Sequence, residues 1–202
     1  SLDEIDKWIE EAEEVGEVAV DTETTSLDPH QADLVGISLC SKIGKACYIP
    51  VGHKSPKCLK KEAVIKKLKK ILEDPSIKKI GQNIKFDFIV FYKCGITLSS
   101  MEDTMLMSYV LDAGKNRHNM DTLSEIHLGH KTISFKDMVG TGKKEINFSE
   151  VELDKAKDYA AEDADVTFRL YKKFIKNLKS EKMINIYEIF EKPLIKILAF
   201  ME

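Results

Sequence analysis

Residues 17–24 read EVAVDTET, an apolar run that ends in two acidic residues, Asp21 and Glu23. A continuous apolar run of this kind is typical of a strand buried on both faces of a sheet. Successive side chains of a strand alternate in direction, so Asp21 and Glu23 point to the same face. Two carboxylates at the end of a buried strand repel each other unless a cation lies between them. An acidic pair at a strand end is also common on protein surfaces, so this stretch indicates a metal site only together with others.

A second acidic stretch, YAAEDADVT, covers residues 159–167. Tyr159 and Asp163 are four residues apart and therefore share one face of a helix. The alanines around Asp163 allow another element to pack closely, so Asp163 is expected to bind the same metal as Asp21. Tyr159 is expected to hydrogen-bond and orient a water, because a phenol with a pKa near ~10 is a poor base. A surface acid beside a half-buried tyrosine is the alternative.

A third stretch, GQNIKFD, covers residues 81–87 and follows a predicted strand. Asn83 can cap the helix that begins there, which places Asp87 one turn into the helix. Asp87 is a candidate ligand for a second metal, directly or through water. The alternative for Asp87 is a first-turn acid favoured by the helix dipole. Asn83 fits the role of a cap better than that of a substrate contact, although it can serve as both.

Together, these three segments bring four carboxylates towards one site, from Asp21, Glu23, Asp87 and Asp163. Carboxylate oxygens are the ligands that Mg²⁺ and Mn²⁺ prefer. Two such ions, typically ~3.5–4 Å apart, can clamp the attacking and leaving oxygens in the hydrolysis of a phosphodiester. The sequence therefore predicts a nuclease that uses two divalent metal ions, Mg²⁺ or Mn²⁺.

Three further residues are candidates for contacts with a nucleic acid. Leu27 follows the DTETT turn and is able to wedge between terminal bases. Phe135 lies in KTISFKDM and could stack on a base, which is worth roughly 1–3 kcal/mol. For both side chains, packing in the core is the alternative. Arg117 lies in the polar stretch GKNRHNMD, where it is either a phosphate contact or a solvated charge.

Composition bounds the class of protein. The chain has 202 residues and a net charge of −3, so any surface for nucleic acid must be local. Residues 42–79 hold twelve lysines, interpreted mostly as solvated helix faces. The four cysteines show no zinc spacing and fit reduced thiols in a cytosolic protein. No apolar run approaches the ~20 residues that span a bilayer. The chain starts at Ser1, which suggests an excised piece.

The hydrophobic patterns outside the acidic stretches predict a mixed α/β sheet flanked by helices. The short SKIG connection favours an antiparallel hairpin between the second and third strands. The 129–147 segment is expected to be loop-rich, and a capping box at Ser149–Glu152 is expected to start a long helix that runs to about residue 178. The other strands are expected over 34–41, 45–51 and 78–83. The other helices are expected over 3–14, 60–73, 84–94, 101–112, 120–128 and 182–202. In the last of these segments, Pro193 interrupts the helix or starts a new one.

Four motifs, matching in type and order from about residue 3 to residue 178, resemble the 3′–5′ proofreading exonuclease domain of bacterial DNA polymerase I, a family A polymerase. The motifs are DTETTSLD, GQNIKFD, RHNMDTLSEIHLGHKTISF and YAAEDADVT. The resemblance implies an RNase H-like fold and membership of the DEDD superfamily. The tyrosine four residues before the last aspartate marks its DEDDy branch.

The resemblance also implies roles for single residues. Asp21, Glu23 and Asp163 would hold one metal, and Asp87 the other through water. Glu23 and Tyr159 would orient the attacking water. The terminal bases would contact Leu27 and Phe135, and the strand would contact Thr24, Asn83 and Arg117. The 3′-to-5′ polarity and the substrate, single-stranded DNA or a frayed 3′ end, follow only from the resemblance.

The last residues, EKPLIKILAFME, resemble the start of the family's polymerase domain. We therefore expect an exonuclease domain over 1–180 and a helical segment over 181–202 that leads into a polymerase domain of the same longer chain. The expected protein is a monomer in the bacterial cytoplasm, at the nucleoid, and binds no membrane. Two alternatives remain, an RNase D-like exoribonuclease and a non-catalytic scaffold domain of a polymerase. The complete carboxylate set disfavours the scaffold, because its repulsion would destabilise a site without metals.

Overall fold

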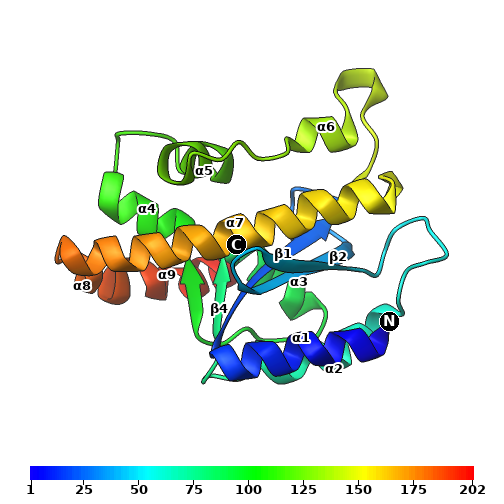
Figure 1. The fold of residues 1–202 in the computed structure, drawn as a ribbon, viewed down its shortest axis with the longest axis horizontal. Helices are drawn as coiled ribbons and strands as arrows, with labels where there is room; N and C mark the ends of the chain where they lie inside the picture. Colours follow the sequence, from blue (N-terminus) through cyan, green and yellow to red (C-terminus); the bar gives the residue numbers. More distant parts are fainter.

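A five-stranded sheet, in the order β3-β2-β1-β4-β5, lies at the centre of the molecule (Figure 1). The computed structural model describes residues 1–202, with the side chain of Lys143 left aside. The first three strands pair antiparallel, whereas β4 and β5 continue the sheet in parallel with β1. The strands are β1 (Glu17–Thr24), β2 (Leu34–Lys42), β3 (Lys45–Pro50), β4 (Lys78–Gly81) and β5 (Met101–Asp103). The mixed α/β architecture and the β2–β3 hairpin are thus confirmed.

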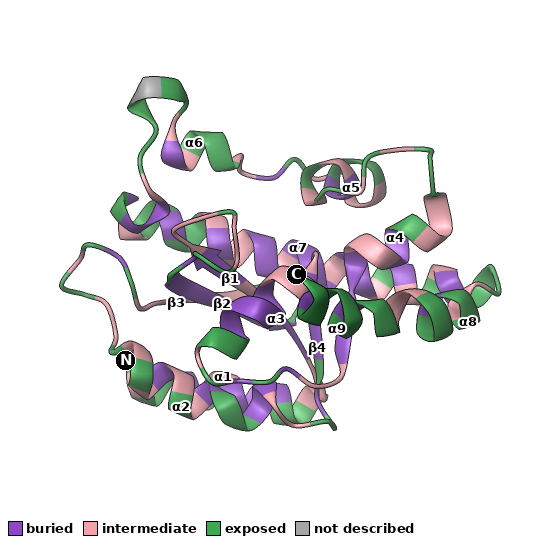
Figure 2. Ribbon diagram, turned by 180° about the vertical axis from the view of Figure 1, so that it is seen from behind, coloured by how far each residue is buried: buried purple, intermediate pink, exposed green. Residues whose placement is uncertain are grey.

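Helices cover both faces of the sheet. One face packs against α1 (Leu2–Val15), α2 (Lys61–Leu72) and α3 (Ile84–Lys93). The other face packs against the long helix α7 (Leu153–Ser180), on which α4 (Thr104–Asp112) and α5 (Met120–Leu128) lie. Figure 2 shows the buried residues running along the sheet between these two layers. β1 is buried on both faces as its apolar run predicts, with Val18, Ala19 and Val20 all inaccessible to solvent.

Several lysines of the 42–79 segment pair with the acidic helix α1. Lys67 Nζ lies 2.5 Å from Asp6 Oδ1, and Lys70 Nζ lies 2.6 Å from Glu13 Oε1. Lys45 forms a further ion pair with Glu11. These pairs lie on the α1–α2 side of the molecule, so these three lysines belong to the scaffold.

Two elements differ from the sequence-based expectation. Met101–Asp103 forms β5 rather than the first turn of a helix, because parallel pairing with β4 holds it extended. A strand this short is too brief to show an alternating pattern. The second is α6 (Phe135–Val139), a short helix inside the segment expected to be loop. The Ser134 side chain caps it by accepting a hydrogen bond from the Lys136 amide.

The expected capping box at the start of α7 is wrong. The sequence NFSEVE contains two overlapping boxes, and the first of them forms. Asn147 and Glu150 cap a 3₁₀ turn at Phe148–Glu150. α7 then begins at Leu153 with Glu152 as an N-cap that makes no side-chain hydrogen bond.

The C-terminal segment is helical, as expected. It consists of α8 (Ile184–Ile186), a π-helical turn at Tyr187–Glu191 and α9 (Lys192–Met201), whose first turn contains Pro193. Phe200 of α9 packs edge-on against Phe88 and Tyr92 of α3. Within the described part of the chain, no helix has both the length and the apolar character needed to cross a bilayer.

Candidate active site

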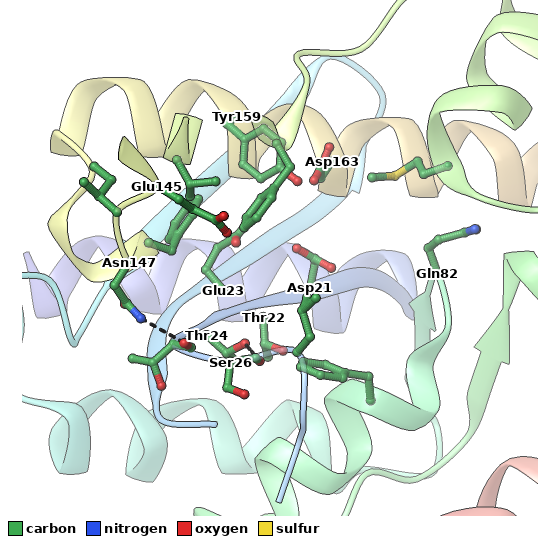
Figure 3. A pocket seen from close by; sticks show the side chains of 18 residues that line it. Asp21, Thr22, Glu23, Thr24, Ser26, Gln82, Glu145, Asn147, Tyr159 and Asp163 are labelled. Atoms are coloured by element: carbon green, nitrogen blue, oxygen red, sulfur yellow. Dashed lines mark hydrogen bonds between the residues drawn. The ribbon is translucent and has the colours of Figure 1, made fainter. Parts of the chain in front are cut away.

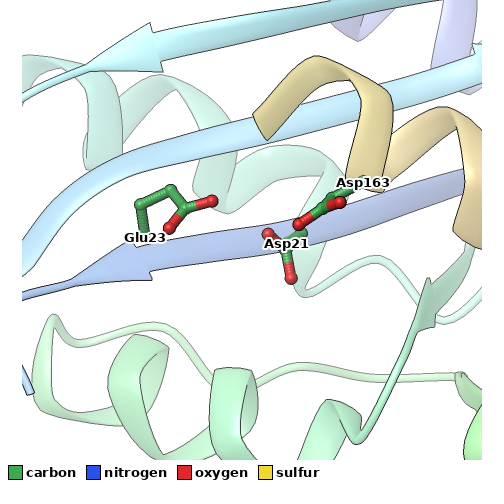
Figure 4. Close-up of side chains that lie close together, drawn as sticks. All are labelled: Asp21, Glu23 and Asp163. Atoms are coloured by element: carbon green, nitrogen blue, oxygen red, sulfur yellow. The ribbon is translucent and has the colours of Figure 1, made fainter. Parts of the chain in front are cut away.

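Three carboxylates meet where β1 runs under α7. Asp21 and Glu23 come from β1 and Asp163 from α7, and one oxygen of each lies within 4.8 Å of the other two (Figure 4). Glu23 is 7% exposed and Asp163 is 4% exposed. The strand alternation thus brings the two β1 acids to the face that α7 covers.

The sequence of α7 explains how Asp163 reaches the strand. Ala156, Ala160 and Ala164 are fully buried and follow one another at four-residue spacing along the helix. Side chains at this spacing lie on one helix face, and their small size allows the helix to approach the sheet closely. Asp163 lies beside this stripe and therefore points at β1.

Burial and mutual repulsion both act on the three acids. Burial raises the pKa of Asp21 to about 6. The pKa of Glu23 is raised well above its ordinary value by burial and then by the charges of Asp21 and Asp163. Burial and then the charge of Asp21 raise the pKa of Asp163, although a hydrogen bond from Tyr159 partly offsets the effect. Converging oxygen ligands whose charges oppose one another fit a hard divalent cation such as Mg²⁺ or Mn²⁺.

In metal-free buffer, the free energy of unfolding is expected to fall as the pH rises from about 4 to about 7. The folded-state pKa of Asp21, about 6, lies above its ordinary value of 3.8. The folded state therefore binds more protons in this window, and Asp21 alone contributes a loss of about 3 kcal/mol. Urea unfolding at pH 4 and pH 7, with and without Mg²⁺, measures this slope.

If these carboxylates bind Mg²⁺, the ion should make the free energy of unfolding less dependent on pH. The positive charge of the bound ion then offsets the repulsion that protons relieve in metal-free buffer. Burial also raises the pKa of Asp103 to about 6. The contribution of Asp103 to the pH dependence of stability should not change when Mg²⁺ is added. A stability that is flat or rises with pH in metal-free buffer contradicts a strained acidic site.

Asp87 reaches the site from the opposite side of the sheet. Its Oδ1 accepts hydrogen bonds from the Thr22 amide at 2.9 Å and from the Thr22 hydroxyl at 2.6 Å. β4 pairs with β1 only as far as Ala19, so the edge of β1 beyond that residue is free for α3. Asp87 is 2% exposed, and burial and then the charge of Asp21 raise its pKa. Asp87 is thus close to the site but separate from the cluster of three carboxylates.

Asn83 does not cap α3 with its side chain. It occupies the N-cap position in a left-handed conformation with φ of 61°. The cap comes instead from Asp103, whose Oδ1 accepts from the Asn83 amide at 3.1 Å and whose Oδ2 accepts from the Ile84 amide at 2.9 Å. The predicted N-cap position of Asn83 is therefore confirmed, but the predicted cap by its side chain is wrong, because β5 places the Asp103 carboxylate there.

Tyr159 lies beside Asp163 on the same face of α7, as its spacing predicts. Its ring belongs to an aromatic cluster, with centroid distances of 6.1 Å to Phe135 and 5.9 Å to Phe148. Burial and then the charge of Asp163 raise the pKa of Tyr159. The phenol therefore keeps its proton and is able to donate a hydrogen bond at the edge of the carboxylate cluster (Figure 3).

Comparison with known proteins identifies the family. A family model described as 3′–5′ exonuclease matches residues 1–179. DNA polymerase I of Rhizobium leguminosarum is 43% identical, over 98% of this chain and 22% of that protein. DNA polymerase I of Pseudomonas aeruginosa is 42% identical with the same coverage. The chain belongs to the 3′–5′ exonuclease family of DNA polymerase I. The exonuclease spans about a fifth of the length of these relatives.

Solved structures show the same fold at lower identity. Brucella melitensis NrnC with bound Mg²⁺ has a TM-score of 0.70 and 23% identity, with 92% of this chain and 83% of that chain covered. Escherichia coli RNase D has a TM-score of 0.71 and 18% identity, with 96% and 48% covered. These likenesses confirm the predicted RNase H-like fold.

The three carboxylates of the exonuclease lie at one side of a cleft with a volume of about 490 Å³. Thr24, Leu27 and Phe135 line it, as the proposed contacts with DNA require. Leu27 is 88% exposed, which excludes core packing for this side chain. Phe135 is 40% exposed, while one side of its ring stacks on the buried Phe148 at 6.1 Å between centroids. Arg117 is exposed but does not line the cleft, and neither does Asn83.

Sequence reasoning missed most of the remaining cleft wall. Gln82 donates to the His118 carbonyl at 2.7 Å. Asn147 donates to the Thr25 carbonyl at 2.8 Å (Figure 3). The position of Gln82, next to Asn83 in the GQN motif, was the available signal. The 145–148 segment carries no periodic pattern that could have revealed it. The other missed residues are Thr22, Thr25, Ser26, Phe86, Met120, Val139, Glu145, Ile146 and Phe148.

Proposed function

We propose that this chain is a metal-dependent 3′–5′ exodeoxyribonuclease, which removes nucleotides from single-stranded or frayed 3′ ends as the proofreading part of a longer DNA polymerase I. The observation that carries the proposal is the cluster of Asp21, Glu23 and Asp163, whose oxygens lie within 4.8 Å of one another beside an open cleft. Membership of the 3′–5′ exonuclease family supports it.

In this proposal, two divalent ions, Mg²⁺ or Mn²⁺, bind at the cleft. Asp21, Glu23 and Asp163 would hold one ion. Asp87, whose Oδ1 accepts two hydrogen bonds from Thr22, would reach the other ion through water. When bound, the ions offset the charge of the carboxylates and of the scissile phosphate and lower the pKa of the attacking water.

The chain's own residues aim the water and hold the strand. Glu23 and Tyr159 orient the water, with Tyr159 acting as a hydrogen-bond donor rather than as a base. Leu27 and Phe135 face the cleft and contact the terminal bases. Thr24 donates from its hydroxyl to the Ser26 carbonyl at 2.9 Å and so shapes the turn that carries Leu27. Asn83 and Arg117 contact only a strand that extends beyond the cleft.

The size of the cleft favours a single strand. A volume of about 490 Å³ is in the range of ordinary ligand pockets, roughly 300–1,000 Å³, and suits an unpaired end better than a duplex. The exposed apolar side chains at its mouth suit stacking on unpaired bases. A paired 3′ end must therefore fray before it can enter, which would favour removal of mismatched nucleotides.

We assign residues 1–180 to the exonuclease domain and 181–202 to a helical segment that leads into a polymerase domain of the same longer chain. The family match, which ends at residue 179, supports this division. Exposed apolar side chains on the segment, among them Ile189, Phe190 and Met201, suit a surface that further chain covers. We place the protein in the bacterial cytoplasm, at the nucleoid, as a monomer.

A nuclease assay in Mg²⁺ tests the proposed function and separates it from an RNase D-like activity. DNA and RNA of one sequence, labelled at the 5′ end, are incubated with the protein. Single-stranded DNA is expected to shorten stepwise from its 3′ end, and a mismatched 3′ end faster than a paired one. Faster shortening of RNA, or equal hydrolysis of blunt duplex and single strand, overturns the proposal.

A further inference from the structure

Behind Glu23, on the face of the sheet that α7 covers, lies a tyrosine that the proposed chemistry does not use. Glu23 pairs with Gly36 on β2, and Asp21 pairs with Ser38. Ser38 in turn pairs with Tyr48 on β3. Residues directly opposite each other in an antiparallel ladder project to the same face. Tyr48 is therefore on the same face as the two β1 acids, two strands away.

Gly36 allows the Tyr48 ring to lean towards Glu23. A Cβ atom at Gly36 would lie 2.1 Å from the Tyr48 hydroxyl oxygen and 2.2 Å from two ring carbons. Such distances are far inside van der Waals contact, so the ring occupies the space that any side chain at residue 36 would need. The Tyr48 hydroxyl thus lies directly over the residue that faces Glu23.

His53 fixes the tyrosine in this place. Its Nε2 lies 2.6 Å from the Tyr48 hydroxyl oxygen, and the two rings meet edge-on at 5.7 Å. His53 is 8% exposed and also contacts Phe148, a wall of the cleft, at 5.8 Å between centroids. The contact with the buried imidazole holds the half-buried phenol in one orientation. A side chain must be fixed in this way if it is to position another residue.

We infer that Tyr48 is a positioning residue for Glu23, held by His53 and admitted by Gly36, and that it keeps the Glu23 carboxylate directed at Asp21 and Asp163. Burial and then the charge of Glu23 raise the pKa of Tyr48, so the phenol stays neutral and adds no charge to the site. The inference rests on the proposed function, because it assigns Glu23 to a metal ion.

The test is the affinity for Mn²⁺, measured by titration calorimetry without DNA. Loss of a group that orients a metal ligand typically costs 10–100-fold in metal affinity or activity, so Tyr48→Phe is expected to weaken Mn²⁺ binding by roughly tenfold. Cleavage should fall in parallel at low Mn²⁺ and recover at saturating Mn²⁺. Tyr171→Phe is the matched control, since it removes a buried hydroxyl that contacts Glu17 at the other end of β1.

Three further variants test how Tyr48 is held. Gly36→Ala keeps the phenol but displaces it, so it should weaken Mn²⁺ binding to the same extent as Tyr48→Phe. His53→Gln retains a group able to hydrogen-bond to Tyr48, whereas His53→Leu does not, so only His53→Leu should lose affinity.

A purely structural role predicts a different result. Tyr48→Phe would then lower the melting temperature and leave the Mn²⁺ affinity at the parent value, which overturns the inference while the proposed function stands. A parent protein that binds no Mn²⁺ overturns both.

Discussion

Asp21→Asn is expected to reduce cleavage of single-stranded DNA by roughly a thousandfold or more, as much as removal of the metal ions does. Asp21 is the residue whose charge contributes to the raised pKa values of Glu23, Asp87 and Asp163 alike, so it lies at the centre of the acidic site. An amide in its place keeps the shape but removes the charge that would attract divalent ions. Single-turnover cleavage of 5′-labelled DNA in Mg²⁺ measures the loss, and the parent in EDTA gives the reference.

The same substitution should stabilise the metal-free protein. Burial raises the pKa of Asp21 to about 6, so at pH 8 the ionised side chain costs folding free energy that a neutral amide does not. We expect a gain of roughly 1–3 kcal/mol in the free energy of unfolding at pH 8. Asp158→Asn, an exposed acid next to Tyr159 on α7, is the control and should change neither quantity. Full activity of Asp21→Asn, or of the parent in EDTA, refutes the metal-dependent reaction.

The opposite effects on activity and stability connect the site to the fold. Three carboxylates crowd together because α7 packs its alanine stripe against the sheet, and this packing brings Asp163 to β1 whether or not ions are present. The fold therefore bears the cost of the repulsion, and bound ions remove it. Such a site is expected where a chain binds metal and not where it serves only as a scaffold.

The arrangement of Asp21, Glu23, Tyr159 and Asp163 could be predicted because each pair lies within one element. Strand alternation places Asp21 and Glu23 on one face of β1, and the four-residue spacing places Tyr159 and Asp163 on one face of α7. The buried run before Asp21 also predicted that β1 is central. Local periodicity is enough for these features, and no contact between distant residues needs to be known.

The parts that could not be predicted depend on contacts between distant residues. Asp87 bonds to Thr22 because β4 is short and leaves the edge of β1 open, a length that no local pattern encodes. Asp103 replaces Asn83 as the cap of α3 because β5 pairs beside β4. The position of Tyr48 over Gly36, the residue opposite Glu23, depends on the register of three strands.

Tyr159→Phe is expected to slow hydrolysis by roughly ten- to a thousandfold, the range typical for one positioned polar group in a catalytic site. The substitution deletes the hydroxyl but keeps the ring, so the packing against Phe135 and Phe148 should survive. Because burial and the charge of Asp163 raise the pKa of Tyr159, the deleted group is a hydrogen-bond donor and not a base. Single-turnover cleavage measures the rate, and a DNA titration in Ca²⁺, which should fill the site without supporting turnover, measures binding.

The two measurements together decide the role of the tyrosine. A slower rate with unchanged DNA affinity supports a residue that orients water, because a neutral phenol is a weak metal ligand and its hydroxyl is not needed to bind the strand. A rate equal to that of the parent would mean that Tyr159 only packs in the aromatic cluster and that Glu23 orients the water alone. If DNA affinity falls while the rate at saturation is unchanged, Tyr159 contacts the substrate instead, and the face that it shares with Asp163 serves binding rather than the chemical step.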